Sequence, residues 1–256
     1  HVSPYADSGG AGVDMALYHE ARSPLEIDLA AGFARESLPG PRPPEDSLSS
    51  IESAVGGHFE DIISGDEGPN ILIGGPGGQS GDDVLNGRGG SDILFPSQDG
   101  EANGGDGEAD LLDFSLYHLG PVDADLASGT AVTHCSNPND LCESGSVTLE
   151  GIEWLRGADW FLGPEKHRDV VVGASDHLTG DDAPNVIFGL DGDDEISGGA
   201  GDDYLSGGEG NDSLDGQDGD DECIGGQVSL NCESDIRPPV HPLEAYRLSW
   251  TKLRFE

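Results

Sequence analysis

The sequence predicts an all-β fold in which short parallel strands stack into a β-solenoid made of two duplicated halves. An apolar residue recurs every nine positions, the residues between are mostly glycine and acid, and this pattern occurs in two blocks. The 256 residues include 41 glycines and 51 Asp or Glu against 11 Lys or Arg, a net charge of −40. Each glycine costs a helix about 1 kcal/mol relative to alanine. An isolated hairpin would bury too little apolar surface to offset chain entropy, so stacking is required.

The nine-residue repeat is clearest in the second block. Residues 198–206 read G-G-x-G-x-D-x-L-x, and residues 207–215 repeat them in phase. The sixth position of successive units in this block is Asn185, Asp194, Asp203, Asp212 and Asp221. In the first block it is Asp61, Asn70, Asp83, Asp92 and Asp110, with four extra residues before Asp83 and a weaker unit that has Glu101 sixth.

The two blocks are halves of a duplication. Residues 25–34 resemble 121–131, residues 48–57 resemble 148–158, and residues 65–74 resemble 180–189. We therefore expect a lead segment at 1–55, a first array at 56–113, a second lead segment with a cysteine loop at 114–158 and a second array at 159–226. Residues 227–256 are expected to form a C-terminal cap or docking tail.

The spacing indicates what the acidic residues do. Six residues can turn and three can extend, so two units form one coil of eighteen residues with a strand on each side. Stacked coils pair their strands in parallel about 4.8 Å apart, and each eighth-position side chain points into a thin shared core. Facing turns then bring carboxylates and carbonyls together. Calcium prefers about six to eight such oxygen ligands, so the sequence predicts calcium ions between the turns.

These repeats resemble the repeats-in-toxin (RTX), or hemolysin-type, calcium-binding nonapeptide family, which implies a parallel β-roll. The resemblance implies ligand pairs from successive coils: Asp61 with Asp83, Asn70 with Asp92, Asp92 with Asp110, Asn185 with Asp203, Asp194 with Asp212, and Asp203 with Asp221. It also implies turn carbonyls from Gly198, Gly199, Gly201, Gly207, Gly208 and Gly210. Sites that use Asn70, Asn185, Glu101 or Gln217 are expected to be weaker.

A competing interpretation concerns residues 99–110. The run DGEANGGDGEAD nearly matches the calcium loop of a helix–loop–helix site. However, Asp106 occupies a position where an apolar residue is expected, and no amphipathic helix flanks the run. The β-roll interpretation is therefore favoured.

Charge and cysteine usage limit the partners and the compartment. The strong negative charge disfavours nucleic acids and anionic membranes as partners, and no apolar run is long enough to span a membrane. A disordered acidic chain is disfavoured because the acids are periodic. Cys135 with Cys142, and Cys223 with Cys232, form two close pairs without a complete zinc ligand set. We expect local disulfides and an extracellular setting.

No catalytic site is expected. The sequence lacks H-E-x-x-H, G-x-S-x-G and a phosphate-binding loop. Asp176 followed by His177 is interpreted as a repeat aspartate next to an outward-facing histidine, and Trp154 and Trp160 as core residues. The predicted function is a secreted calcium-binding protein with a non-catalytic surface, adhesive or matrix role. A basic, aromatic tail with Arg237, Arg247, Lys252 and Arg254 is expected to cap the last coil or to dock on the acidic body of another copy, and docking would allow copies to assemble into a filament. The alternative is the calcium-binding C-terminal portion of a secreted protease or lipase.

Overall fold

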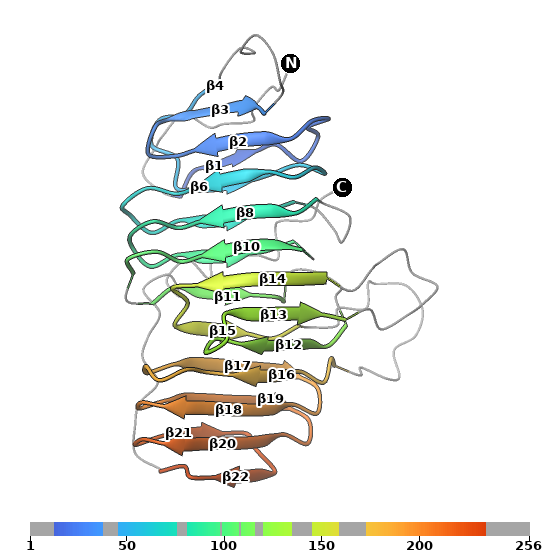
Figure 1. Cartoon of the computed structure of the whole chain (residues 1–256), viewed down its shortest axis with the longest axis vertical. Coiled ribbons are helices and arrows are strands. Elements are labelled where there is room, and N and C mark those ends of the chain that lie inside the picture. Colours follow the sequence, from blue (N-terminus) through green and yellow to red (C-terminus); the bar gives the residue numbers. More distant parts are fainter. Residues whose placement is uncertain are drawn as a thin grey trace.

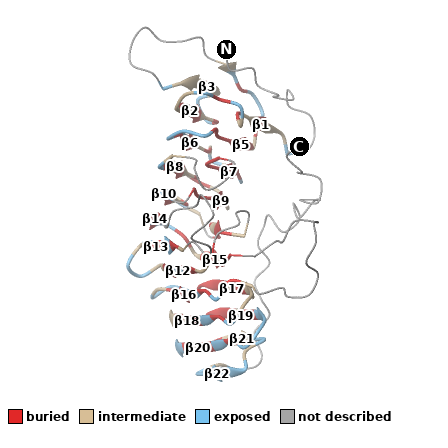
Figure 2. Cartoon of the chain, turned by 90° about the vertical axis from the view of Figure 1, so that its right-hand side faces the viewer, coloured by how far each residue is buried: buried red, intermediate tan, exposed pale blue. Residues whose placement is uncertain are grey.

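The computed structural model describes residues 13–37, 46–75, 81–97, 99–107, 109–115, 120–134, 145–158 and 173–233. These residues form short strands and turns, with no helix among them. The strands stack along one axis into an elongated molecule with two facing sheets (Figures 1 and 2). In the described ranges, no helix is long and apolar enough to cross a membrane.

One sheet, which we call sheet A, has nine strands and is parallel throughout. Its strands in spatial order are β1 (Met15–Leu17), β5 (Ser53–Val55), β7 (Ile71–Ile73), β9 (Ile93–Phe95), β11 (Leu111–Asp113), β15 (Trp154–Arg156), β17 (Val186–Asp191), β19 (Tyr204–Glu209) and β21 (Glu222–Ile224).

The opposite sheet, sheet B, has thirteen strands. In spatial order they are β22 (Val228–Leu230), β20 (Ser213–Asp218), β18 (Glu195–Ala200), β16 (His177–Thr179), β12 (Val122–Asp125), β13 (Thr130–Thr133), β14 (Gly145–Glu150), β10 (Gly100–Asn103), β8 (Asp83–Asn86), β6 (Ile62–Ser64), β2 (Leu25–Asp28), β3 (Phe33–Glu36) and β4 (Asp46–Ser47). Pairing is parallel except at β2–β3–β4 and β12–β13–β14, which are antiparallel.

The core lies between the two sheets and is built from the eighth residue of each repeat. Strand register places equivalent residues side by side, so that Leu205 of β19 lies between Ile187 of β17 and Cys223 of β21. Nine eighth-position residues are at most 1% exposed: Ile63, Leu72, Leu85, Leu94, Leu112, Ile187, Ile196, Leu205 and Leu214. Cys223, at the eighth position of the last repeat, is partly buried. The predicted all-β parallel roll with a thin apolar core is confirmed.

The two arrays are successive parts of one stack. In sheet A, β11 of the first array pairs with β15, and β15 pairs with β17 of the second array. Sheet B is also continuous, but the hairpin strands β13 and β12 lie between β14 and β16. The sheet B side therefore holds two more strands than the sheet A side at this point, and the turns on either side of them are spread apart.

Three sequence interpretations can be compared with this architecture. Residues 100–103 form β10, so the helix–loop–helix interpretation of 99–110 is wrong for the described residues. Glu101 lies on the exposed face of β10 and not at the end of a turn. Trp154 packs with Ala109, Val186 and Tyr204 in a small separate cluster and not in the main core. Cys135, Cys142, Trp160 and residues 234–256 lie outside the described residues, so the interpretations made for them stay predictions.

Candidate calcium sites

The turns that join the sheets form two columns along the stack. Column 1 contains the turns that lead from sheet B to sheet A, and column 2 contains those that lead from sheet A to sheet B. The sixth residue of each repeat ends a turn just before the next strand, and all of these side chains are at most 2% exposed. Column 1 holds Asn70, Asp92, Asp110, Asn185, Asp203 and Asp221, and column 2 holds Asp61, Asp83, Asp176, Asp194 and Asp212.

Within each column, hydrogen bonds connect the sixth residue of one coil to that of the next. The backbone N–H of Asn185 donates to Asp203 Oδ1 at 2.8 Å, and the N–H of Asp203 donates to Asp221 Oδ1 at 2.9 Å. The same bond joins Asp61 to Asp83, Asn70 to Asp92, Asp92 to Asp110, and Asp194 to Asp212. The structure therefore brings together every pair that the resemblance implied.

The second carboxylate oxygen has a different environment. Seven aspartates have an Oδ2 atom that is buried and has no hydrogen-bond partner: Asp83, Asp92, Asp110, Asp194, Asp203, Asp212 and Asp221. Burying a charged group without a partner costs several kcal/mol. A cation bound next to each of the seven Oδ2 atoms would remove this cost.

Backbone carbonyls converge on these oxygens. A Cβ atom placed on Gly198 would lie 2.8 Å from Gly216 O of the next coil and closer still to Asp203 Oδ2. Gly189 has the same relation to Gly207 O, at 2.7 Å, and to Asp194 Oδ2. Only glycine fits where these oxygens meet. A buried cluster of carboxylate and carbonyl oxygens matches the hard oxygen ligands that calcium prefers.

The predicted turn glycines divide into two groups. The carbonyls of Gly198 and Gly207 point at the first glycine of the preceding coil, beside its sixth-position side chain. Gly199, Gly201, Gly208 and Gly210 instead have φ between 107° and 153°, which lets the chain turn. Positive φ also occurs in three non-glycine residues that occupy the second position of a repeat: Arg88, Leu190 and Gln217.

In four sixth-position residues, every side-chain oxygen has a hydrogen-bond partner. These four residues are the first of column 1 and the first of column 2 in each half of the chain. Asp61 accepts from the N–H of Leu25 and of Gly57, and Asp176 from the N–H of Val122 and of Ala158. Asn70 and Asn185 each accept an N–H from their own turn, from Asp66 and Asp181. Each also donates its amide to the carbonyl oxygen of a glutamate in the coil before, Glu52 and Glu153, at 3.3 and 3.4 Å. Protein donors and acceptors thus supply their partners.

Asp176 was absent from the ligand pairs drawn from the sequence. The sequence identifies it as a repeat aspartate, but the residues before it interrupt the nine-residue phase and leave it without a predicted partner. The duplication could have revealed its place in column 2, since Asp176 has the same role in the second half as Asp61 in the first.

Burial raises the pKa of most column carboxyl groups. It raises the pKa of Asp83 and Asp92 to about 7, and that of Asp61, Asp194 and Asp203 to about 6. Neighbouring carboxylates raise the pKa further at Asp83, Asp92, Asp194 and Asp203. The ionised columns are therefore unfavourable without cations.

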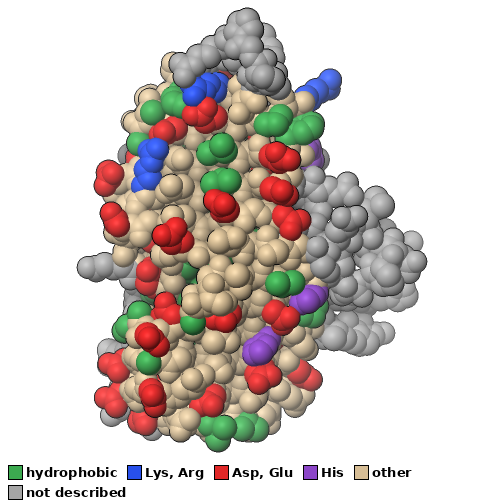
Figure 3. Space-filling view, viewed as in Figure 1, with side chains coloured by type: hydrophobic (Ala, Val, Ile, Leu, Met, Phe, Trp, Pro, Cys, Tyr) green, Lys and Arg blue, Asp and Glu red, His purple; other side chains and the backbone are tan. Residues whose placement is uncertain are grey.

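One protein cation lies at the N-terminal end of column 1. The Arg88 guanidinium donates to both carboxylate oxygens of Asp28, at 2.9 and 2.8 Å, and to Gly65 O at 2.9 Å. On the face shown in Figure 3, carboxylates are spread along the molecule, while the Lys and Arg side chains lie near the N-terminal end. No Lys or Arg occurs between residues 173 and 233.

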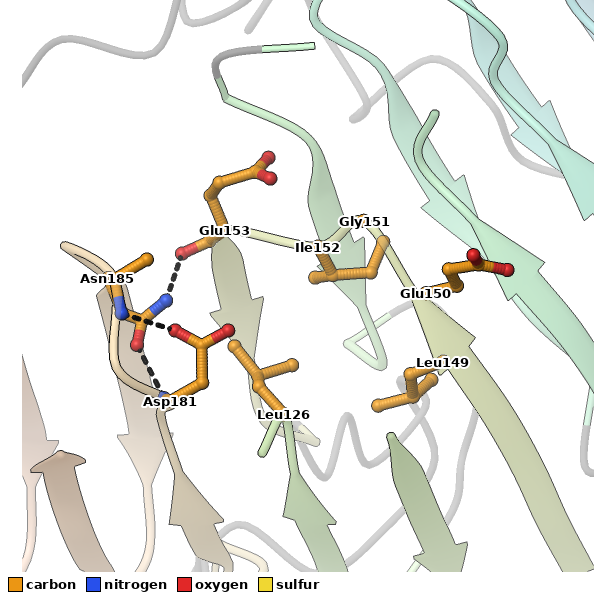
Figure 4. A pocket seen from close by; sticks show the side chains of 9 residues that line it. Leu126, Leu149, Glu150, Gly151, Ile152, Glu153, Asp181 and Asn185 are labelled. Atoms are coloured by element: carbon orange, nitrogen blue, oxygen red, sulfur yellow. Dashed lines mark hydrogen bonds between the residues drawn. The ribbon is translucent and has the colours of Figure 1, made fainter. Parts of the chain in front are cut away.

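A pocket of about 100 Å³ lies where the β12–β13 hairpin spreads the turns of column 1. Figure 4 shows the Glu153 side chain turned away from Asn185, while the Glu153 carbonyl points toward the Asn185 amide. The column of carboxylates is therefore interrupted here. The lining residues are Leu126, Leu149, Glu150, Gly151, Ile152, Glu153, Asp181, Ala183 and Asn185.

Comparison with protein families agrees with this geometry. The family model of the RTX calcium-binding nonapeptide repeat matches residues 55–77, 78–99, 172–205 and 197–228. No curated protein matches the chain. The chain therefore carries the RTX calcium-binding nonapeptide repeat, with two matched copies in each array.

Proposed function

We propose that this chain is a secreted, calcium-binding solenoid that folds when calcium fills the two turn columns. The observation that carries this proposal is the set of seven buried, unpartnered Oδ2 atoms. Without cations, facing carboxylates repel, and a net charge of −40 opposes compaction. Because the sites do not exist in the unfolded chain, the free energy of calcium binding becomes free energy of folding.

Two features support secretion. Cys223 in β21 forms a disulfide with Cys232, the pairing expected from the sequence, and disulfides persist in oxidising compartments. Extracellular calcium modules also work with weak sites, with Kd of about 0.1–1 mM. A chain of this kind would stay unfolded at low cytosolic calcium and fold after export.

The proposed role is structural and non-catalytic, as part of a surface, adhesive or matrix assembly. The pocket of about 100 Å³ is smaller than the roughly 300–1,000 Å³ of small-molecule sites. The last described strands leave Ile224, Val228 and Leu230 about half exposed, at 45%, 51% and 53%. Open strand edges with apolar side chains favour stacking of a second copy, and a head-to-tail contact of this kind propagates as a filament.

Calcium titration tests the folding proposal. Far-ultraviolet circular dichroism and hydrodynamic radius would be followed from chelator to millimolar calcium, with magnesium as the control ion. We expect a transition from an expanded chain to a compact β-rich one with calcium, and a much weaker response to magnesium. Identical spectra and radii in chelator and in calcium would contradict it.

Light scattering and electron microscopy in calcium test the assembly proposal. The whole chain would be compared with a chain truncated after Glu233, which removes the basic tail but leaves every described residue in place. We expect filaments only with the tail. Monomers in both samples would reject the filament. A catalytic domain encoded in the same reading frame would instead favour the calcium-binding portion of an enzyme.

A further inference from the structure

Three short turns of column 1 lie outside the nonapeptide pattern but resemble one another. They are Ser50–Ile51–Glu52, Gly151–Ile152–Glu153 and Asn231–Cys232–Glu233. Each begins with a residue in the left-handed region, with φ of 55°, 60° and 49°, and ends with glutamate. We call these three-residue segments closing turns. They replace a six-residue repeat turn with a much shorter connection.

The glutamate of each closing turn makes the bond that a sixth-position aspartate makes within an array. Glu153 Oε2 accepts the backbone N–H of Asp110, and Glu233 Oε2 accepts the N–H of Asp221, both at 2.9 Å. Glu52 Oε2 accepts the N–H of Asp14 at the same distance. A glutamate is one methylene longer than an aspartate, and this extra reach suits the shorter turn.

The first residue of a closing turn supplies the carbonyl that the next repeat would have supplied. A Cβ atom on Gly104 would lie against Gly151 O and 2.6 Å from Asp110 Oδ2. A Cβ atom on Gly216 would lie against Asn231 O and Asp221 Oδ2. Asp110 and Asp221 are fully buried, and their Oδ2 atoms have no partner.

We propose that two closing turns complete the last calcium site of column 1 in each array. Gly151 O and Glu153 would complete the site of Asp110, and Asn231 O and Glu233 would complete that of Asp221. These four groups lie outside the residues that match the RTX repeat model, 55–99 and 172–228. The inference rests on calcium binding by the columns, as proposed above. It assigns to the non-repeat segments a role in ending each ion column and joining the two arrays.

Column 1 is also interrupted on the other side of the closing turn that contains Glu153, toward the second array. Beyond Glu153, the Asn185 amide donates to the Glu153 carbonyl, and the Glu153 carboxylate points away from Asn185 (Figure 4). On this side, the closing turn therefore faces the neutral amide of Asn185 and not a carboxylate.

The variants Glu153→Gln and Glu233→Gln test the proposal. Glutamine keeps an oxygen that can accept the N–H of Asp110 or Asp221 but removes the negative charge. The matched control is Glu150→Gln, the same change on an exposed side chain just before the closing turn, where Glu150 accepts a bond from Asn103. Native mass spectrometry and calorimetry would count the bound calcium ions and measure their affinities.

We expect each variant to lose one calcium ion, or to bind one ion at least about tenfold more weakly (about 1.4 kcal/mol), and the double variant to lose two. The control should match the wild type. If the wild type binds calcium and both variants keep its stoichiometry and affinities, the proposal is wrong although the function stands. If the wild type binds no calcium, the proposed function itself fails. A variant unfolded in millimolar calcium but refolded at higher calcium supports a ligand role, and one that no calcium concentration refolds contradicts it.

Discussion

The choice between asparagine and aspartate at the sixth repeat position depends on what lies in the neighbouring coil. Asn185 faces the carbonyl of Glu153 and needs a donor, which its amide provides at 3.4 Å. Asp203, one coil later, has a buried Oδ2 next to Gly216 O, and the ionised carboxylate and the carbonyl are both acceptors that a bound cation would satisfy. In column 1, asparagine therefore marks the start of each half, and aspartate marks the ion-facing interior.

A matched pair of variants separates these roles. Asp203→Asn lets the new amide donate to Gly216 O but should weaken calcium binding, so its cost in stability should grow with the calcium concentration. Asn185→Asp should cost about 1–3 kcal/mol at every calcium concentration that folds the chain, because a carboxylate cannot donate to Glu153 O. Denaturant unfolding at a series of calcium concentrations above the folding midpoint measures both costs. Costs that change with calcium in the same way for the two substitutions would refute the distinction.

At the scale of the turn column, protons and calcium should compete for the same carboxylates. Burial raises the pKa of Asp83 and Asp92 to about 7, and that of Asp194 and Asp203 to about 6, from the ordinary aspartate value of 3.8. Between pH 3.8 and about 6–7, the folded state therefore holds more protons than the unfolded state. Acidic pH thus favours folding without calcium, and this contribution is lost as pH rises through about 6–7.

We therefore expect the chain in chelator to be more compact and richer in β-structure at about pH 5 than at about pH 8, as measured by hydrodynamic radius and far-ultraviolet circular dichroism. Calcium should restore the β-structure at the higher pH, because it binds the deprotonated carboxylates. A calcium-free β-structure signal that increases from the lower to the higher pH would show that the columns are not the dominant titrating groups.

The sequence predicts the stacked coils and the pairs of facing turn residues, because the nine-residue repeat sets the positions of both. Leu205 and Asp203, for example, follow directly from their positions in a repeat. Asp176 is recognisable as a repeat aspartate, but its place in column 2 was missed because the residues before it break the phase. Glu101 was assigned to a turn because the short turn after β9 shifts the frame; Ser97 Oγ accepts the Asp83 N–H there instead. The different roles of Asn185 and Asp203, and the closing turns, depend on contacts between distant segments, which the repeat does not encode.

At the scale of the whole molecule, the shared sheets couple the two arrays. Leu155 of β15 is fully buried and lies in register between Leu112 of the first array and Ile187 of the second. Leu155→Ala should cost about 2–5 kcal/mol through the lost contacts and the cavity. In calcium, the variant should still unfold in a single transition at lower denaturant. Two separate transitions in the wild type would show that the arrays are independent.

The most direct test of the central claim is a crystal structure of the calcium-loaded protein with the ions located by anomalous scattering. We expect an ion within about 2.3–2.6 Å of Oδ2 in each of the seven aspartates, with turn carbonyls completing its ligands. The seven are Asp83, Asp92, Asp110, Asp194, Asp203, Asp212 and Asp221. Oδ2 atoms that contact only water or backbone N–H groups in saturating calcium would contradict the account.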